Sequence, residues 1–244
     1  MAIITIDIIS DIVCAWCYIG TKSLEKAISI YQKTYPGGRN DIFVLTWRPY
    51  YLNYHASLTS IDKHVLAQTK LRHMTAEQRT ALEQRMDRIG RAAGIVFRNG
   101  GKIGSTRPAH HLIALCQRQI APGSAEGLAG GKGMYPVEVR DALVARLFEA
   151  YHELERDIAS REVLREIAVD VGMDEAEVDG CLDACFSNGT GVEESSVDRE
   201  ARENKEAGTG VPLFIIQGVH RVEGAQDVME LVEIFGKTRE NDEL

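Results

Sequence analysis

The sequence predicts an α/β protein in which both ends of the chain build one sheet and a long helical segment is inserted between them. Two stretches rich in β-branched and aromatic residues, 3–9 and 41–52, flank a helical pattern near the N-terminus, and two more strand-like stretches occur near the C-terminus. The residues between these ends show helical spacing almost throughout. We therefore expect one discontinuous α/β domain, 1–53 and 208–244, and a helical insertion domain, 54–207.

The N-terminal part is typical of a strand–helix–strand unit. The stretch IITIDII at 3–9 is largely β-branched, which predicts a central strand covered on both faces. Apolar residues then recur at helical spacing from Cys14 to Tyr35, where YPGG stops the helix. The stretch DIFVLTWRPYYL at 41–52 supplies the second strand.

The insertion is predicted to be helical. Thr75 and Gln78 have the spacing of a capping box, and Ser160 is a suitable N-cap for a later helix. A glycine-rich stretch at 121–133 lacks the spacing of a phosphate-binding loop and is predicted to be a surface loop. The predicted helices span 61–71, 75–93, 108–119, 136–154, 160–171, 175–186 and 192–207.

The C-terminal part returns to strand patterns. The stretches VPLFIIQG at 211–218 and HRVEG at 220–224 meet at a short glycine-containing turn, which predicts a hairpin, and 225–235 follows as a helix. Pro212 opens an apolar strand, a position where proline is tolerated, and cis proline is commonest in tight turns.

The charge composition and the lack of a long apolar run limit the partners and compartments that we expect. The chain has 244 residues with 28 basic and 36 acidic side chains, so it lacks the basic surplus that binds nucleic acid or anionic membranes. It also lacks an apolar run of about 20 residues and a signal-peptide pattern. We expect a cytoplasmic protein, with the endoplasmic reticulum as an alternative because the chain ends in Asn-Asp-Glu-Leu.

Two of the five cysteines form a Cys-x-x-Cys motif, in the stretch DIVCAWCYIG at 11–20. Cys14 falls at a helix N-terminus, where the helix dipole and unpaired N–H groups favour thiolate. Cys17 lies one turn later and could resolve a mixed disulfide formed at Cys14. The pair also follows a strand, at the edge where parallel sheets usually present their sites.

Other interpretations of the cysteines remain open. A structural zinc site needs four ligands, and no second motif of suitable spacing occurs, so no metal is expected. Two buried structural cysteines are the other alternative for the motif. Cys181 and Cys185 lie four apart on a predicted helix and form either a second redox pair or two core-facing residues.

Several further stretches carry a family resemblance. They are WRPYYLN at 47–53, STRPAHHL at 105–112, LFEAYHELERDIASREVLREIA at 147–168 and GVPLFIIQGVHRVEGAQ at 210–226. Together with DIVCAWCYIG, they resemble the DsbA-like oxidoreductases, and most closely their FrnE-like branch. That branch is related to the 2-hydroxychromene-2-carboxylate isomerases and the kappa-class glutathione transferases.

The resemblance implies a thioredoxin fold with a large α-helical insertion. It implies that Cys14 is the nucleophile and Cys17 its partner, that Pro212 is cis and faces the pair, and that Val211 offers backbone groups to the substrate. Substrate contacts are also expected from Trp16, His110 and Trp47, and the aromatic residues Trp16, Tyr18, Trp47 and Tyr50 could frame an apolar groove. No bound cofactor is implied, but glutathione could serve as reductant or co-substrate.

Two positions depart from the family pattern: Ala15 stands where proline is frequent, and Ser105 stands where asparagine is expected. Because Ala15 and Trp16 carry no charge, we expect a reduction potential below that of DsbA, which has a histidine in this dipeptide. His110 and His111 lie at a helix start, where the dipole favours neutral imidazole.

The predicted function is therefore that of a dithiol–disulfide oxidoreductase using the couple Cys14-Ala-Trp-Cys17, with a protein or a small molecule as its thiol or disulfide substrate. One alternative is a glutathione-dependent or cofactor-free isomerase or transferase acting on a small aromatic or polyketide-derived substrate. Another is a non-catalytic binding module. A homodimer is left open.

Overall fold

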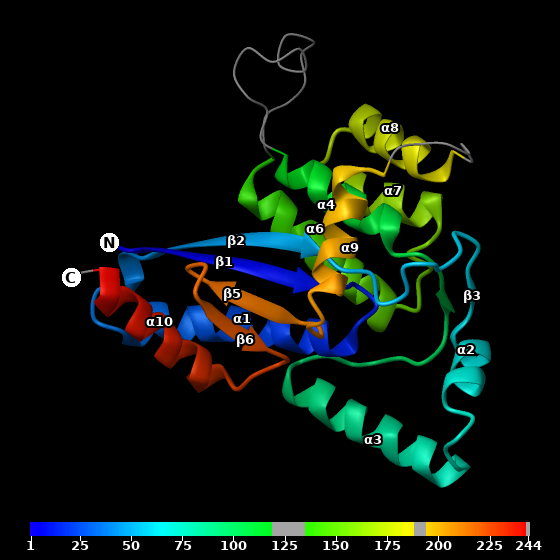
Figure 1. Cartoon of the computed structure of the whole chain (residues 1–244), viewed down its shortest axis with the longest axis horizontal. Coiled ribbons are helices and arrows are strands. Elements are labelled where there is room, and N and C mark those ends of the chain that lie inside the picture. The colour runs from blue at the N-terminus through cyan, green and yellow to red at the C-terminus, as the bar shows by residue number, and fades with distance from the viewer. Residues whose placement is uncertain (119–134, 188–193, 243–244) are drawn as a thin grey trace. The chain divides into compact units, whose positions relative to one another are not determined.

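The computed structural model describes residues 1–118, 135–187 and 194–242 (Figure 1). The chain forms two compact units. The glycine-rich stretch at 121–133 and the predicted helix start at Val192 lie outside the described residues. The first unit comprises 1–52, 85–96 and 200–244, and the second comprises 53–84 and 97–199.

The first unit is built on a four-stranded mixed sheet in the order β2-β1-β5-β6. Its strands are β1 (Ile3–Ser10), β2 (Ile42–Pro49), β5 (Leu213–Ile216) and β6 (His220–Glu223). β1 is parallel to β2 and antiparallel to β5, and β5 and β6 form the predicted hairpin. The central position of β1 is confirmed. The sheet is parallel only at β1 and β2, because the C-terminal strands enter as an antiparallel pair.

Burial along β1 corrects one expectation. Ile4, Ile6 and Ile8 are at most 1% exposed, whereas Ile3 is 52% exposed. Only the end of the strand is covered on both faces. The first half alternates, with Ile3 and Thr5 exposed, and the side chain of Gln217 accepts hydrogen bonds from the backbone N–H and the hydroxyl of Thr5.

Two helices of the first unit pack against each other, α1 (Ala15–Thr34) and α10 (Val228–Asp242). The rings of Tyr31 and Phe235 meet edge to face at 5.8 Å. The hydroxyl of Tyr31 donates to the buried carboxylate of Asp41 at 2.9 Å, and this carboxylate also accepts the N–H of Ala2. Asp41 follows the short helix η1 (Gly38–Asn40), so these bonds fix the start of β2 against α1.

The second unit is mainly helical, as predicted. It contains α2 (Lys63–Lys70), α4 (Arg107–Gln117), α6 (Val137–His152), α7 (Arg161–Asp170) and α8 (Glu175–Phe186). α4 packs against α6, α7 and α8. The two-residue strands β3 (Ile61–Asp62) and β4 (Lys102–Ile103) pair antiparallel. The sequence wrongly placed residues 61–62 in a helix, because so short a pairing leaves no periodic pattern.

Two predicted helix starts are confirmed. Thr75 and Gln78 exchange reciprocal side-chain-to-backbone hydrogen bonds before α3 (Ala76–Ala92), which is the geometry of a capping box. The hydroxyl of Ser160 accepts the N–H of Val163 at the start of α7.

The unit boundaries differ from those predicted, since residues 85–96 and 200–207 belong to the first unit. The end of α9 (Ser196–Glu206) is tied there by Asn204, which donates to the carbonyl of Pro49, and by Lys205, which donates to the carbonyls of Tyr51 and Leu52. Helical periodicity continues across both boundaries, so it could not locate them.

Candidate active site

Cys14 is the N-cap residue of α1, at the turn that follows β1. Its N–H donates to the carbonyl of Asp11 at 3.0 Å, and its own carbonyl accepts the N–H of Tyr18 at 3.2 Å. The backbone at Cys14 is extended, and its side chain does not cap the helix. The sulfur therefore lies at the positive end of a 20-residue helix, as the sequence predicts.

The two cysteines of the motif are free thiols that differ in exposure and acidity. Cys14 is 8% exposed, and Cys17 is fully buried. A hydrogen bond from Cys17 lowers the pKa of Cys14 even though burial opposes ionisation. Burial, followed by the hydrogen bond to Cys14, raises the pKa of Cys17 well above its ordinary value. Cys14 is therefore the thiol that ionises first, and Cys17 keeps its proton.

The segment before β5 faces Cys14. The peptide bond between Val211 and Pro212 is cis. The thiol of Cys14 donates to the carbonyl of Val211 at 3.8 Å. These two residues lie 197 positions apart in the sequence, and the pairing of β1 with β5 brings their segments together.

Gly20 is a site residue that the sequence analysis missed. A Cβ atom at this position would lie 2.9 Å from Cγ of Pro212 and 3.2 Å from a ring carbon of Phe214. The absence of a side chain thus allows α1 to approach the proline closely. The available signal was a glycine inside a helical pattern, which is unfavourable unless close packing requires it.

Asp11 is a second residue that was missed. Its side chain is 1% exposed and accepts the N–H of Leu52 at 2.8 Å. The negative charge of Asp11 raises the pKa of Cys14. The pKa of Tyr50 is raised first by burial and next by the same negative charge. Asp11 and Tyr50 therefore belong to the electrostatic surroundings of the cysteine pair.

The residues predicted to contact substrate differ in their position and in their exposure to solvent. Trp16 is 40% exposed beside the cysteine pair, and Val211 and Pro212 lie at Cys14. Trp47 is 7% exposed on β2, in register with Ile8 of β1. Two other aromatic residues proposed for the groove, Tyr18 and Tyr50, are also buried, at 4% and 8% exposed.

The two predicted histidines lie on α4 in the second unit. His110 is buried, and its role in substrate binding stays a prediction. For His111, the expectation of a neutral imidazole is wrong. Burial would lower its pKa, but hydrogen bonds to Asp198 and Cys185 outweigh burial and raise the pKa to about 9. Asp198 lies 87 residues further along the chain, so no local pattern could signal this contact.

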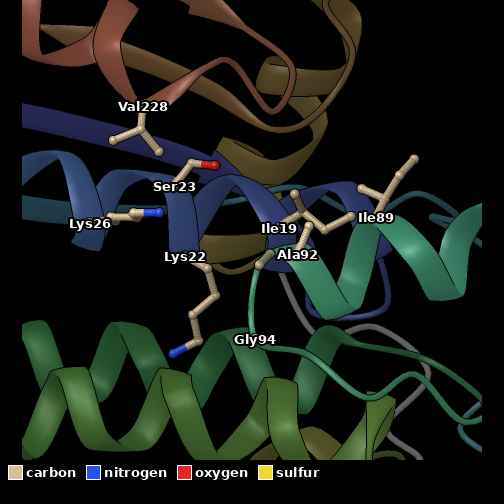
Figure 2. A pocket seen from close by; sticks show the side chains of 9 residues that line it. Ile19, Lys22, Ser23, Lys26, Ile89, Ala92, Gly94 and Val228 are labelled. Atoms are coloured by element: carbon tan, nitrogen blue, oxygen red, sulfur yellow. The ribbon is translucent and has the colours of Figure 1, made fainter.

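A hollow of about 420 Å³ borders α1 one turn beyond the cysteines (Figure 2). Figure 2 shows Lys22, Ser23 and Lys26 extending from α1. The ammonium of Lys22 pairs with Glu25 at 3.0 Å. Neither cysteine lines this hollow, so the surface at Trp16 and Val211 remains the candidate for substrate contact.

Within residues 1–118, 135–187 and 194–242, no group of three or more His, Cys, Asp or Glu side chains is placed to hold a metal ion. Over the same ranges, no helix combines the length and apolar character needed to cross a bilayer.

The comparisons with known proteins identify the fold. A family model described as the DSBA-like thioredoxin domain matches residues 5–236. A probable DsbA oxidoreductase from Streptomyces coelicolor shares 24% identity at a TM-score of 0.72, over 96% of this chain and 89% of that one. No curated protein matches the sequence.

Two other solved structures are less similar. The cytosolic disulfide reductase DsbM from Pseudomonas aeruginosa, solved with GSH, shares 17% identity at a TM-score of 0.56, over 96% of this chain and 99% of that one. A 2-hydroxychromene-2-carboxylate isomerase shares 13% identity at a TM-score of 0.56, over 98% of each chain. At these identities the likeness establishes a common fold.

Proposed function

Because this chain belongs to the DSBA-like thioredoxin family, we propose that it is a thiol–disulfide oxidoreductase of the FrnE-like type working through Cys14 and Cys17. The observation that carries the proposal is the division of acidity within the pair. Cys14 has a lowered pKa at the start of α1, and Cys17 has a raised one behind it. A dithiol couple needs this combination, since one sulfur must attack the substrate as a thiolate while the other stays protonated until the mixed disulfide has formed.

In the first step, the Cys14 thiolate attacks one sulfur of a substrate disulfide. The substrate S–S bond breaks, a mixed disulfide forms at Cys14, and the other substrate sulfur leaves as a thiolate that takes a proton from solvent. Trp16 offers an exposed apolar surface beside this sulfur. The backbone of Val211 supplies polar groups for an extended substrate segment, as in the resembling family.

In the second step, Cys17 resolves the intermediate. It gives up its proton as it attacks the Cys14 sulfur, so that the internal disulfide forms, the mixed disulfide breaks, and the second half of the substrate leaves as a thiolate that takes up a proton. Two electrons have then passed from the cysteine pair to the substrate disulfide. In reverse, the internal disulfide oxidises a substrate dithiol. We propose that the couple works in the cytoplasm with glutathione as its reductant.

The test is a redox titration in glutathione buffers, using a variant that lacks the other three cysteines through Cys116→Ser, Cys181→Ser and Cys185→Ser. The remaining thiols are alkylated at each ratio and counted by mass spectrometry. We expect a reversible internal disulfide with a potential between about −120 and −270 mV. Cys14→Ser and Cys17→Ser, each made in this variant, should both abolish it.

A different result would contradict the dithiol cycle. If no internal disulfide forms, or if a stable glutathione adduct at Cys14 is the only product, the proposal is wrong. Assays for a glutathione-dependent or cofactor-free isomerase or transferase would then follow, with small aromatic or polyketide-derived compounds as substrates.

A further inference from the structure

A second pair of cysteines lies on α8 in the helical unit. Cys181 and Cys185 are one helical turn apart, and both are free thiols. Cys185 is 3% exposed, while Cys181 is half-buried and lines a hollow. The pair thus has one accessible sulfur and one enclosed sulfur.

The enclosed sulfur is held by a polar network. Cys185 is hydrogen-bonded to both Cys181 and His111. The Nε2 atom of His111 lies 3.3 Å from a carboxylate oxygen of Asp198 and 3.3 Å from the hydroxyl of Ser195. Arg107 donates two hydrogen bonds to the same carboxylate, each 2.8 Å long. The two bonds from Arg107 balance the charge of Asp198 and fix the imidazole beside Cys185.

The accessible sulfur is the more acidic of the two. The hydrogen bond from Cys185 lowers the pKa of Cys181 against the effect of burial, and the positive charge of Arg118 lowers it further. The same hydrogen bond, followed by burial, raises the pKa of Cys185 despite the presence of His111. Cys181 is therefore the nucleophile, and Cys185 is the thiol that retains its proton.

The hollow beside Cys181 has a volume of about 550 Å³, within the range of small-molecule sites. His111, Arg118 and Glu177 line it together with the hydroxyl-bearing Ser196. The guanidinium of Arg118 lies 3.8 Å from a carboxylate oxygen of Glu177. With His111 protonated, Arg107, His111 and Arg118 stand against the two carboxylates of Asp198 and Glu177 at and beside this hollow, and this positive surplus favours a ligand carrying carboxylates.

We propose that Cys181 is a second thiol site, at which a low-molecular-weight disulfide carrying carboxylates reacts to leave a mixed disulfide in this hollow. The Cys181 thiolate attacks one sulfur of the disulfide, whose S–S bond breaks as the new S–S bond forms. The other half leaves as a thiolate and takes a proton from solvent. The disulfide is the oxidant, and one of its sulfurs is reduced to a thiol.

The product is the mixed disulfide because Cys181 and Cys185 lie four residues apart inside the single helix α8, where a disulfide between them would be strained. The Cys14 site differs, because Cys14 is the N-cap residue of α1 and Cys17 lies three residues later in its first turn, where the second cysteine can complete the cycle. The proposal does not depend on the activity of Cys14 and Cys17.

The experiment uses the full chain with Cys14→Ser and Cys17→Ser and glutathione disulfide as the probe. Intact mass and peptide mapping should find one glutathionyl group per chain, located on Cys181. Adding Cys181→Ser should abolish the adduct, and adding Cys116→Ser should leave it unchanged. Cys116 is the matched control because burial raises its pKa to about 11. Cys181 should react at least about tenfold faster than Cys116.

Charge selection is tested with Arg118→Gln on the same background. The rate with glutathione disulfide should fall about threefold to tenfold, while the rate with the cationic disulfide cystamine should not fall. Circular dichroism checks that each variant is folded. Failure to modify Cys181, equal rates at Cys181 and Cys116, or an internal disulfide between Cys181 and Cys185 would each overturn the proposal without bearing on Cys14.

Discussion

Replacing His111 with glutamine tests how strongly the contact with Asp198 stabilises the helical unit. Glutamine keeps a polar side chain of similar reach but cannot carry the positive charge. In the folded chain, burial works against the imidazolium, but the hydrogen bonds to Asp198 and Cys185 raise the pKa of His111 from 6.5 to about 9. The imidazole is 14% exposed, so solvent screens this interaction only weakly.

The size and sign of the effect on the free energy of unfolding follow from the rise in the pKa of His111. A rise from 6.5 to about 9 corresponds to about 3 kcal/mol, since each pH unit is worth about 1.4 kcal/mol. Because the folded pKa is raised, this stabilisation is fully present below about pH 6.5 and is lost as the pH rises through about 9. Lys63 acts in the opposite direction above about pH 8, because burial lowers its pKa to about 8.

The assay is urea unfolding in the presence of a reductant, at pH values from about 5.5 to about 10. The quantity to compare is the free energy of unfolding of the wild type minus that of His111→Gln, because the effect of Lys63 cancels in this difference. We expect the difference to fall by about 3 kcal/mol across the range. His73→Gln, at an exposed position, is the control. A difference that stays constant with pH would refute the reasoning.

Three further predictions concern the cysteine site and its packing. Gly20→Ala should lower the free energy of unfolding by about 1–3 kcal/mol, because its Cβ would meet Pro212 at 2.9 Å. Gly180→Ala, where an added Cβ would meet no atom within 4 Å beyond its chain neighbours and its own helix backbone, should raise it by up to about 1 kcal/mol, and equal effects in urea unfolding would contradict the packing argument. Cys17→Ala should raise the pKa of Cys14 and slow its alkylation near neutral pH, whereas Cys17→Ser keeps a donor and should slow it less. The reverse order of alkylation rates would refute the role of that hydrogen bond. The reduction potential of the pair should lie below that of DsbA, and a value at or above about −130 mV would disprove the argument from the uncharged dipeptide between the cysteines.

Local features of the sequence were sufficient to locate the helix that carries the reactive cysteine. Periodicity placed a helix after the first strand, and Cys14 was expected and found at its start. The caps at Thr75 and Ser160 were equally predictable, because each depends on hydrogen bonds within three residues. The family resemblance added Val211 and Pro212, which no local pattern connects to Cys14.

Other features depend on contacts between residues far apart in the chain. The unit boundaries fall inside continuous helical patterns, and the direction of β5 is set by pairing with β1 rather than by its own residues. The charge of His111 is set by Asp198, against the preference of the helix start where it lies.

The sequence by itself determined the elements, their caps and the identity of the thiols, because these depend on spacing within a few turns of helix or strand. The tertiary structure decided how the pKa values of the two thiols are separated, because the full burial of Cys17 and its hydrogen bond to Cys14 depend on packing. It also showed why residue 20 is glycine, since the proline that approaches it comes from the other end of the chain.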